Sequence, residues 1–157
     1  MAFPKVGNKT PVFKLKNQHN ETVDLKSFAG DKNVVVYFYP KALTPGCTTQ
    51  ACALRDIQNE LEKRDTVVFG VSPDPVEKLQ KFIDKHDLNF DLLSDVDHTI
   101  AEKYGAWGLK KFMGKEFMGI LRTTFIIDKD SRLLGVMDKF KTKNHHEELI
   151  NFLDANL

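Results

Sequence analysis

Two short and almost uninterrupted apolar runs constrain the fold of this chain more than any other feature. They cover residues 33–38 and 66–71, and apolar residues recur at helical spacing between them, from Cys47 to Lys63. Runs rich in β-branched residues are typical of strands buried on both faces of a sheet, and parallel neighbours need a helical crossover. The pattern predicts a βαβ unit, and α/β folds tend to place a site at the carboxyl end of such a strand.

The other segments continue this alternation of strands and helices. The patterns predict an N-terminal hairpin from residues 12–15 and 22–25, a helix after Asp74 with Pro75 as its first residue, and a short helix from Asp97 to Tyr104. They also predict a second hairpin from residues 123–127 and 133–137, and a last helix that begins with a capping box at 144–147. Residues 105–122 read as a loop. We therefore expect one α/β domain spanning residues 1–157.

Charge and composition exclude several classes of partner. Lys and Arg number 23 against 22 Asp and Glu, so the net charge of +1 does not favour nucleic acid as a partner. No apolar stretch is long enough to span a membrane, and the N-terminus has no leader pattern, so we expect a soluble cytoplasmic protein with no membrane partner. Two cysteines are too few for a disulfide scaffold at this length.

Cys47 is the candidate nucleophile of the chain. Thr44 is suited to cap a helix and Pro45 to begin it, which places Cys47 in the first turn. The free N–H groups and the positive dipole end of that turn favour an anion such as a thiolate. The alternative is that Cys47 is a small buried apolar residue, as many free cysteines are.

The sequence around Cys47 resembles the active-site motif of the peroxiredoxins, Pro40-x-x-x-Thr44-x-x-Cys47. The longer run from Tyr39 to Asp56, which includes Cys52, and the segment from Arg122 to Asp128 resemble the bacterioferritin comigratory protein, or Q-type, subfamily. This resemblance implies a thioredoxin-like fold, in which helices flank a central mixed β-sheet that is preceded by an N-terminal β-hairpin.

The resemblance also implies an activity, that of an antioxidant thiol peroxidase acting on hydrogen peroxide and organic hydroperoxides. Cys47 would be the peroxidatic cysteine and become a sulfenic acid, with Thr44, Pro40 and Arg122 around it. Cys52 would resolve that acid as an intramolecular disulfide, which thioredoxin or a similar dithiol then reduces. The subfamily implies a monomer without a cofactor, and we identify no metal motif in the sequence.

Simpler roles exist for each of these residues. Thr44 would only cap the helix, Pro40 would only end the strand, Arg122 would lie on the surface, and Cys52 would be a buried cysteine of the helix face. Two rival functions are thiol–disulfide exchange, which four intervening residues between the cysteines disfavour, and redox sensing through a partner protein.

Overall fold

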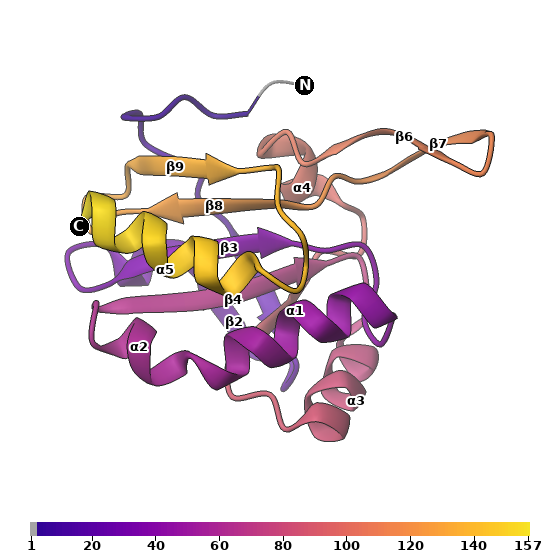
Figure 1. Cartoon of the computed structure of the whole chain (residues 1–157), viewed down its shortest axis with the longest axis horizontal. Helices are drawn as coiled ribbons and strands as arrows, with labels where there is room; N and C mark the ends of the chain where they lie inside the picture. The colour runs from indigo at the N-terminus through magenta and orange to yellow at the C-terminus, as the bar shows by residue number, and fades with distance from the viewer. Residues whose placement is uncertain (1–2) are drawn as a thin grey trace.

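The computed structural model describes residues 3–157, with one seven-stranded mixed sheet between two layers of helices and loops (Figure 1). The sheet has the order β2-β1-β5-β4-β3-β8-β9. Its strands are β1 (Lys14–Asn17), β2 (Thr22–Asp24), β3 (Asn33–Phe38), β4 (Thr66–Ser72), β5 (Leu92–Ser94), β8 (Thr123–Ile127) and β9 (Leu133–Met137). The helices are η1 (Leu25–Phe28), α1 (Pro45–Asp56), α2 (Gln58–Glu62), α3 (Val76–His86), α4 (Thr99–Lys103) and α5 (His145–Asn156).

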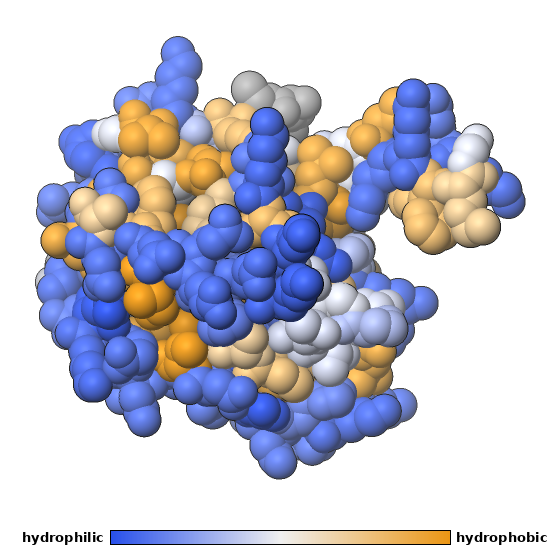
Figure 2. All heavy atoms as spheres, in the orientation of Figure 1, coloured by the Kyte–Doolittle hydropathy of each residue, from blue (hydrophilic) through white to orange (hydrophobic). Residues whose placement is uncertain are grey.

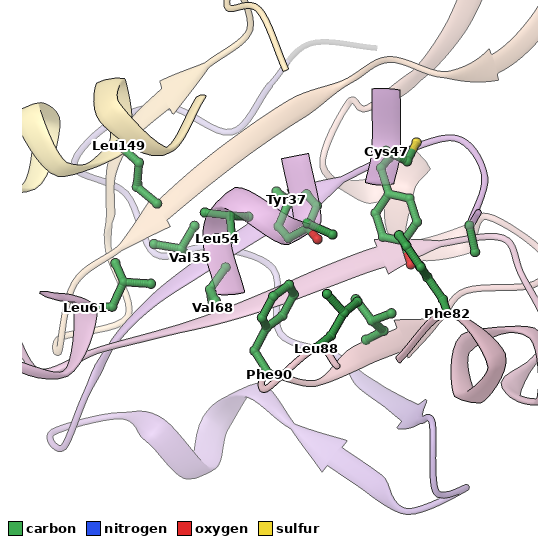
Figure 3. Packing of buried hydrophobic residues seen from close by; sticks show 14 of the residues in the cluster. Val35, Tyr37, Cys47, Leu54, Leu61, Val68, Phe82, Leu88, Phe90 and Leu149 are labelled. Atoms are coloured by element: carbon green, nitrogen blue, oxygen red, sulfur yellow. The ribbon is translucent and has the colours of Figure 1, made fainter. Parts of the chain in front are cut away.

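The central strand β3 is buried along its whole length, as its apolar sequence predicts. It pairs in parallel with β4 and antiparallel with β8, so the sheet is mixed and the predicted βαβ unit is confirmed. Alternate residues of β3 point into two separate clusters. Val35 and Tyr37 pack with α1, α2, α3 and α5 (Figure 3), while Val34 and Val36 pack with α4 and the N-terminal segment.

Both predicted hairpins form. β1 pairs antiparallel with β2, and β8 pairs antiparallel with β9. The single helix expected from Cys47 to Lys63 is divided, because Ile57 leaves helical geometry with φ −108° and ψ 15° and separates α1 from α2. The apolar spacing continues across this break, so the sequence pattern did not reveal it.

The expected loop at residues 105–122 is wrong, because this segment forms a second, two-stranded sheet. β6 (Trp107–Phe112) pairs antiparallel with β7 (Lys115–Ile120), and the hairpin extends away from the body of the molecule (Figure 1). The two turn residues Met113 and Gly114 both have positive φ, which is the geometry of a type I′ turn. Glycines and lysines interrupt the alternation by which a strand is usually recognised.

Two predicted N-cap positions are wrong, and a third is right in position but lacks the predicted capping bond. The N-cap of α3 is Pro75 rather than Asp74, and the N-cap of α4 is His98 rather than Asp97. Asn144 does precede α5, but its side chain makes no capping hydrogen bond. The Asp74 carboxylate bonds instead to the Ala42 N–H and the Ser72 hydroxyl, and Asp95 rather than Asp97 accepts from the N–H groups of Ile100 and Ala101 in α4. Within residues 3–157, no helix is long and apolar enough to cross a membrane.

We predict that stability falls in mild acid because of His145. This side chain is fully buried, and its Nε2 forms a 2.8 Å hydrogen bond with Thr124 Oγ1. Burial, with the charges of His146 and Arg122, lowers its pKa to about 3. The unfolded chain takes up this proton near pH 6.5, so the stability present above that pH is lost as the pH falls toward 3, by about 2 kcal/mol between pH 7 and 5.

Denaturant unfolding of the parent chain and of His145→Gln at both pH values tests this prediction. In the variant, most of the difference in the free energy of unfolding between pH 7 and pH 5 should disappear. The exposed His19→Gln is the matched control and should keep it. An unchanged pH dependence in His145→Gln would contradict the prediction.

Candidate active site

The loop that leads from β3 into α1 is held in an unusual backbone conformation. Leu43 has φ 68°, a left-handed geometry that is rare for a residue with a large side chain. Thr44 then returns to extended geometry as the N-cap of α1, and Pro45 begins the helix, as predicted. The Thr44 hydroxyl donates to the Lys41 carbonyl at 2.7 Å, which closes the loop on itself.

The buried carboxylate of Asp74 fixes this loop to the neighbouring strand. Its Oδ2 accepts from the Ala42 backbone N–H at 2.7 Å and from the Ser72 hydroxyl at 2.8 Å. Hydrogen bonds to a charged acceptor are stronger than neutral ones, and leaving the Ala42 N–H unpaired inside the protein would be costly. Asp74 therefore positions the loop rather than capping α3.

Cys47 lies in the first turns of α1, with 1% of its surface exposed, and meets a guanidinium group. Arg122 Nη2 donates to Cys47 Sγ at 3.3 Å, and Nη1 of the same residue donates to Gln50 Oε1 at 2.8 Å. Gln50 lies one turn after Cys47 and is also buried. A fixed positive charge in such a poorly hydrated place is suited to stabilise negative charge that develops at the sulfur during a reaction.

The groups beneath Cys47 add no negative charge. Tyr37 and Tyr39 lie in the same apolar cluster, at whose edge Cys47 is seen in Figure 3. Burial raises the pKa of both phenols far above the ordinary value, so they remain neutral at physiological pH. Burial, followed by the charge of Arg122, lowers the pKa of Lys110 on β6. The thiol is therefore in hydrogen-bond contact with one guanidinium group and packs in a cluster whose phenols are neutral.

The other residues singled out from the sequence lie around this pair without bonding to it directly. Thr44 and Pro40 lie in the same loop and are half-buried, and the Thr44 hydroxyl bonds to Lys41 as described. Cys52 follows on α1, half-buried, and both cysteines are free thiols. The structure brings Arg122 to Cys47 across 75 residues of sequence and leaves Cys52 on another side of the helix.

Three residues of the site were not identified from the sequence. Gln50 orients Arg122, Asp74 holds the loop, and Thr142 lies beside Gly46 next to the Arg122 guanidinium. The spacing of Gln50 three residues after Cys47 places it one turn along the same helix, which is a usable signal. Asp74 and Thr142 come from distant segments and carry no such signal.

This arrangement is suited to nucleophilic chemistry at sulfur. A thiol is buried at a helix N-terminus, a guanidinium donates to it, and free hydroxyl lone pairs lie in the adjoining loop. Across residues 3–157, no group of three or more His, Cys, Asp or Glu side chains is placed to hold a metal ion. The chemistry supported by these contacts is that of Cys47 itself.

Known proteins resemble the chain over nearly its whole length. The AhpC/TSA family matches residues 6–135. Peroxiredoxin Bcp of Escherichia coli is 52% identical over 149 residues, covering 95% of each chain. Peroxidoxin BcpB of Mycobacterium tuberculosis has a crystal structure that superposes with a TM-score of 0.84 at 36% identity, covering 96% of this chain and 97% of that one.

A third relative is the bacterioferritin comigratory protein of Xanthomonas campestris, studied for its alkyl peroxide reduction activity in trapped intermediate and ligand complexes. Its structure has a TM-score of 0.85 at 29% identity and covers 91% of this chain and 90% of that one. These similarities confirm the thioredoxin-like fold expected from the sequence. They show that the chain belongs to the AhpC/TSA family as a peroxiredoxin, a thiol-dependent peroxidase.

Proposed function

We propose that Cys47 is the peroxidatic cysteine of this peroxidase. Its thiolate attacks one oxygen of the peroxide, the S–O bond forms as the O–O bond breaks, and the departing oxygen takes a proton to leave as water or an alcohol. Cys47 is thereby oxidised to the sulfenic acid. The observation that carries this proposal is the 3.3 Å contact between Arg122 Nη2 and Cys47 Sγ in a buried first helical turn.

Arg122, Thr44 and Pro40 assist this step in different ways. Arg122 stabilises the thiolate and the charge that moves onto the leaving oxygen. The Thr44 hydroxyl donates its hydrogen bond to the Lys41 backbone carbonyl. The lone pairs of the hydroxyl oxygen are therefore free to accept a hydrogen bond from the peroxide O–H. Pro40 is half-buried at the end of β3 and limits the access of water to the thiolate.

Cys52 is the proposed resolving cysteine, and thioredoxin the proposed reductant. The Cys52 thiolate attacks the sulfenic sulfur of Cys47, the S–S bond forms as the S–O bond breaks, and the departing hydroxyl takes a proton to leave as water. A dithiol protein then returns both thiols to the reduced state. The free thiols at positions 47 and 52 on one helix support this cycle within a single chain.

The same cycle suits a monomeric protein of the cytoplasm that takes part in antioxidant defence. An intramolecular disulfide needs no second subunit, and free thiols persist in a reducing compartment. The proposed single domain covers residues 1–157, because both apolar clusters share strand β3 and neither could be separated from the other.

Replacing Arg122 with Met should slow the oxidation of Cys47 by peroxide about 10²–10³-fold, the usual effect of removing one aligned donor. Gln50→Leu should slow it less, because Arg122 remains but loses its orienting acceptor. Rapid-mixing kinetics of Cys47 oxidation by hydrogen peroxide measures both. Arg132→Met, which replaces an exposed arginine, is the control. A rate unchanged by Arg122→Met would remove this residue from the mechanism.

Serine substitutions should separate the two cysteine roles. Cys47→Ser should abolish peroxide turnover. Cys52→Ser should react once and then accumulate Cys47 as sulfenic or more oxidised acid, which intact-protein mass detects. Full thioredoxin-dependent turnover by Cys52→Ser would show that another group resolves the acid.

Disulfide formation should require local unwinding of α1. Both cysteines lie in one helix, and five helical residues advance about 7.5 Å and turn about 500°. Their Cα atoms are then about 8–9 Å apart, beyond the ~7 Å limit for a disulfide without backbone movement. Hydrogen exchange should therefore show less amide protection at residues 47–52 in the oxidised protein than in the reduced one. Equal protection in both states, with the bond verified by mass, would contradict this expectation.

A further inference from the structure

The β6–β7 hairpin exposes an unusual concentration of large apolar side chains. Five of the nine exposed large apolar residues found within residues 3–157 lie on it, and at its tip Phe112 and Met113 are 68% and 87% exposed. The five are Leu109, Phe112, Met113, Phe117 and Met118. Figure 2 shows them as an apolar cluster on an arm that stands clear of the body. Exposed clusters of this kind mark interaction surfaces.

The hairpin is directly connected to the active site. β7 ends at Ile120, two residues before Arg122, and the Leu121 N–H donates to the Ala106 carbonyl at 2.8 Å to close the base of the arm. Lys110 extends across Gly119, where a Cβ atom would come within 3.2 Å of its side chain. Its lowered pKa, caused by burial and then by Arg122, agrees with a side chain directed toward the site.

The side chains on the Lys110 face of the hairpin follow from the strand register. Lys110 pairs with Phe117 across the strands, and Phe112 pairs with Lys115. Because side chains alternate along a strand and cross-strand partners share a face, these four side chains lie on the same face. That face combines two aromatic rings with two ammonium groups on an arm whose base lies two residues before Arg122.

The charge of the arm differs from that of the rest of the chain. Three lysines at 110, 111 and 115 accompany one acid, Glu116, which pairs with Lys111 at 3.4 Å. This net positive charge exceeds the +1 of the whole chain, so the remaining residues together are slightly negative. A partner with acidic groups around an apolar contact surface is complementary to this arm.

We propose that this hairpin is the docking surface for the dithiol protein that reduces the enzyme, a partner with exposed apolar groups and acidic residues around its thiols. The inference rests on the proposed Cys47–Cys52 disulfide. Each turnover requires a reductant to reach that bond, and α1 must change shape to form it. The hairpin lies outside α1, so it offers the same contact surface in both redox states.

The chemistry at the docked surface is ordinary thiol–disulfide exchange. A thiolate of the partner attacks one sulfur of the Cys47–Cys52 bond, a mixed disulfide forms, and the other cysteine leaves as a thiolate that takes a proton. The second thiol of the partner then displaces the enzyme, which becomes fully reduced while the partner is oxidised. Phe and Met side chains at the tip are residue types enriched in protein interfaces.

The double variant Phe112→Thr, Met113→Asn tests this proposal. Thr suits a strand, and Asn before Gly114 is the preferred type I′ pair, so the hairpin should still form. With thioredoxin, thioredoxin reductase and NADPH, the KM for thioredoxin should rise about tenfold or more, with kcat unchanged. Turnover with dithiothreitol and the rate of Cys47 oxidation by hydrogen peroxide should not change. Val6→Ser, an exposed apolar position at the far end of the sheet, is the matched control.

The charge contribution is tested separately by Lys115→Glu. This variant should raise the KM for thioredoxin, as should added salt, whereas Lys5→Glu at the far end should not.

An unchanged KM in the double variant overturns the proposal, and so does an equal loss of turnover with dithiothreitol. If the double variant changes the oligomeric state but not the KM, the arm contacts a second copy of the chain. If it changes binding to anionic lipid vesicles but not the KM, the arm contacts a lipid surface. Either result overturns the proposal. If the parent enzyme turns over with dithiothreitol but not thioredoxin, this docking role fails while the peroxidase activity stands.

Discussion

The carboxylate of Asp74 is the constraint on which the rest of the active site depends. By accepting from the Ala42 N–H and the Ser72 hydroxyl, it ties the loop after β3 to the end of β4. The strained Leu43 conformation persists because this loop is held at several points. α1 then begins at a fixed place above the sheet, and its first turn presents Cys47 to Arg122. A change at Asp74 would therefore act on the site through the backbone.

The electrostatics of the site follow from what is buried around the thiol. Arg122 is the charged group that touches Cys47, and Gln50 holds it with a neutral acceptor. A carboxylate in place of Gln50 would neutralise part of the positive charge that Arg122 presents to the sulfur. Burial also keeps Tyr37 and His145 neutral, so there is neither a phenolate to compete with the sulfur for the guanidinium nor an imidazolium to share its role. The positive charge of Arg122 therefore acts mainly on Cys47.

Much of the fold could be predicted because its central strands carry their signal locally. The bounds of β3 agree with the prediction, since the five apolar residues that follow Asn33 are typical of a strand covered on both faces. The β6–β7 hairpin was missed because Gly108, Gly114, Gly119 and three lysines leave no regular alternation to detect. The contacts of Cys47 with Arg122, and of Asp74 with Ala42, join residues far apart in sequence. The first was anticipated only through the family motif, and nothing in the sequence indicated the second.

The composition of α1 divides the helix into a labile beginning and a stable end. Residues 45–49 read Pro-Gly-Cys-Thr-Thr, which are weak helix formers, and the Thr49 hydroxyl bonds back to the Pro45 carbonyl at 3.0 Å. Ala51 and Leu54 are fully buried against the sheet, so the later turns are anchored by packing. Unwinding that begins at Thr44 can thus reach Cys47 without exposing Leu54. Because the Arg122 contact joins the first turns of α1 to the sulfur of Cys47, the proposed oxidation of that sulfur would change this contact at the labile end of the helix.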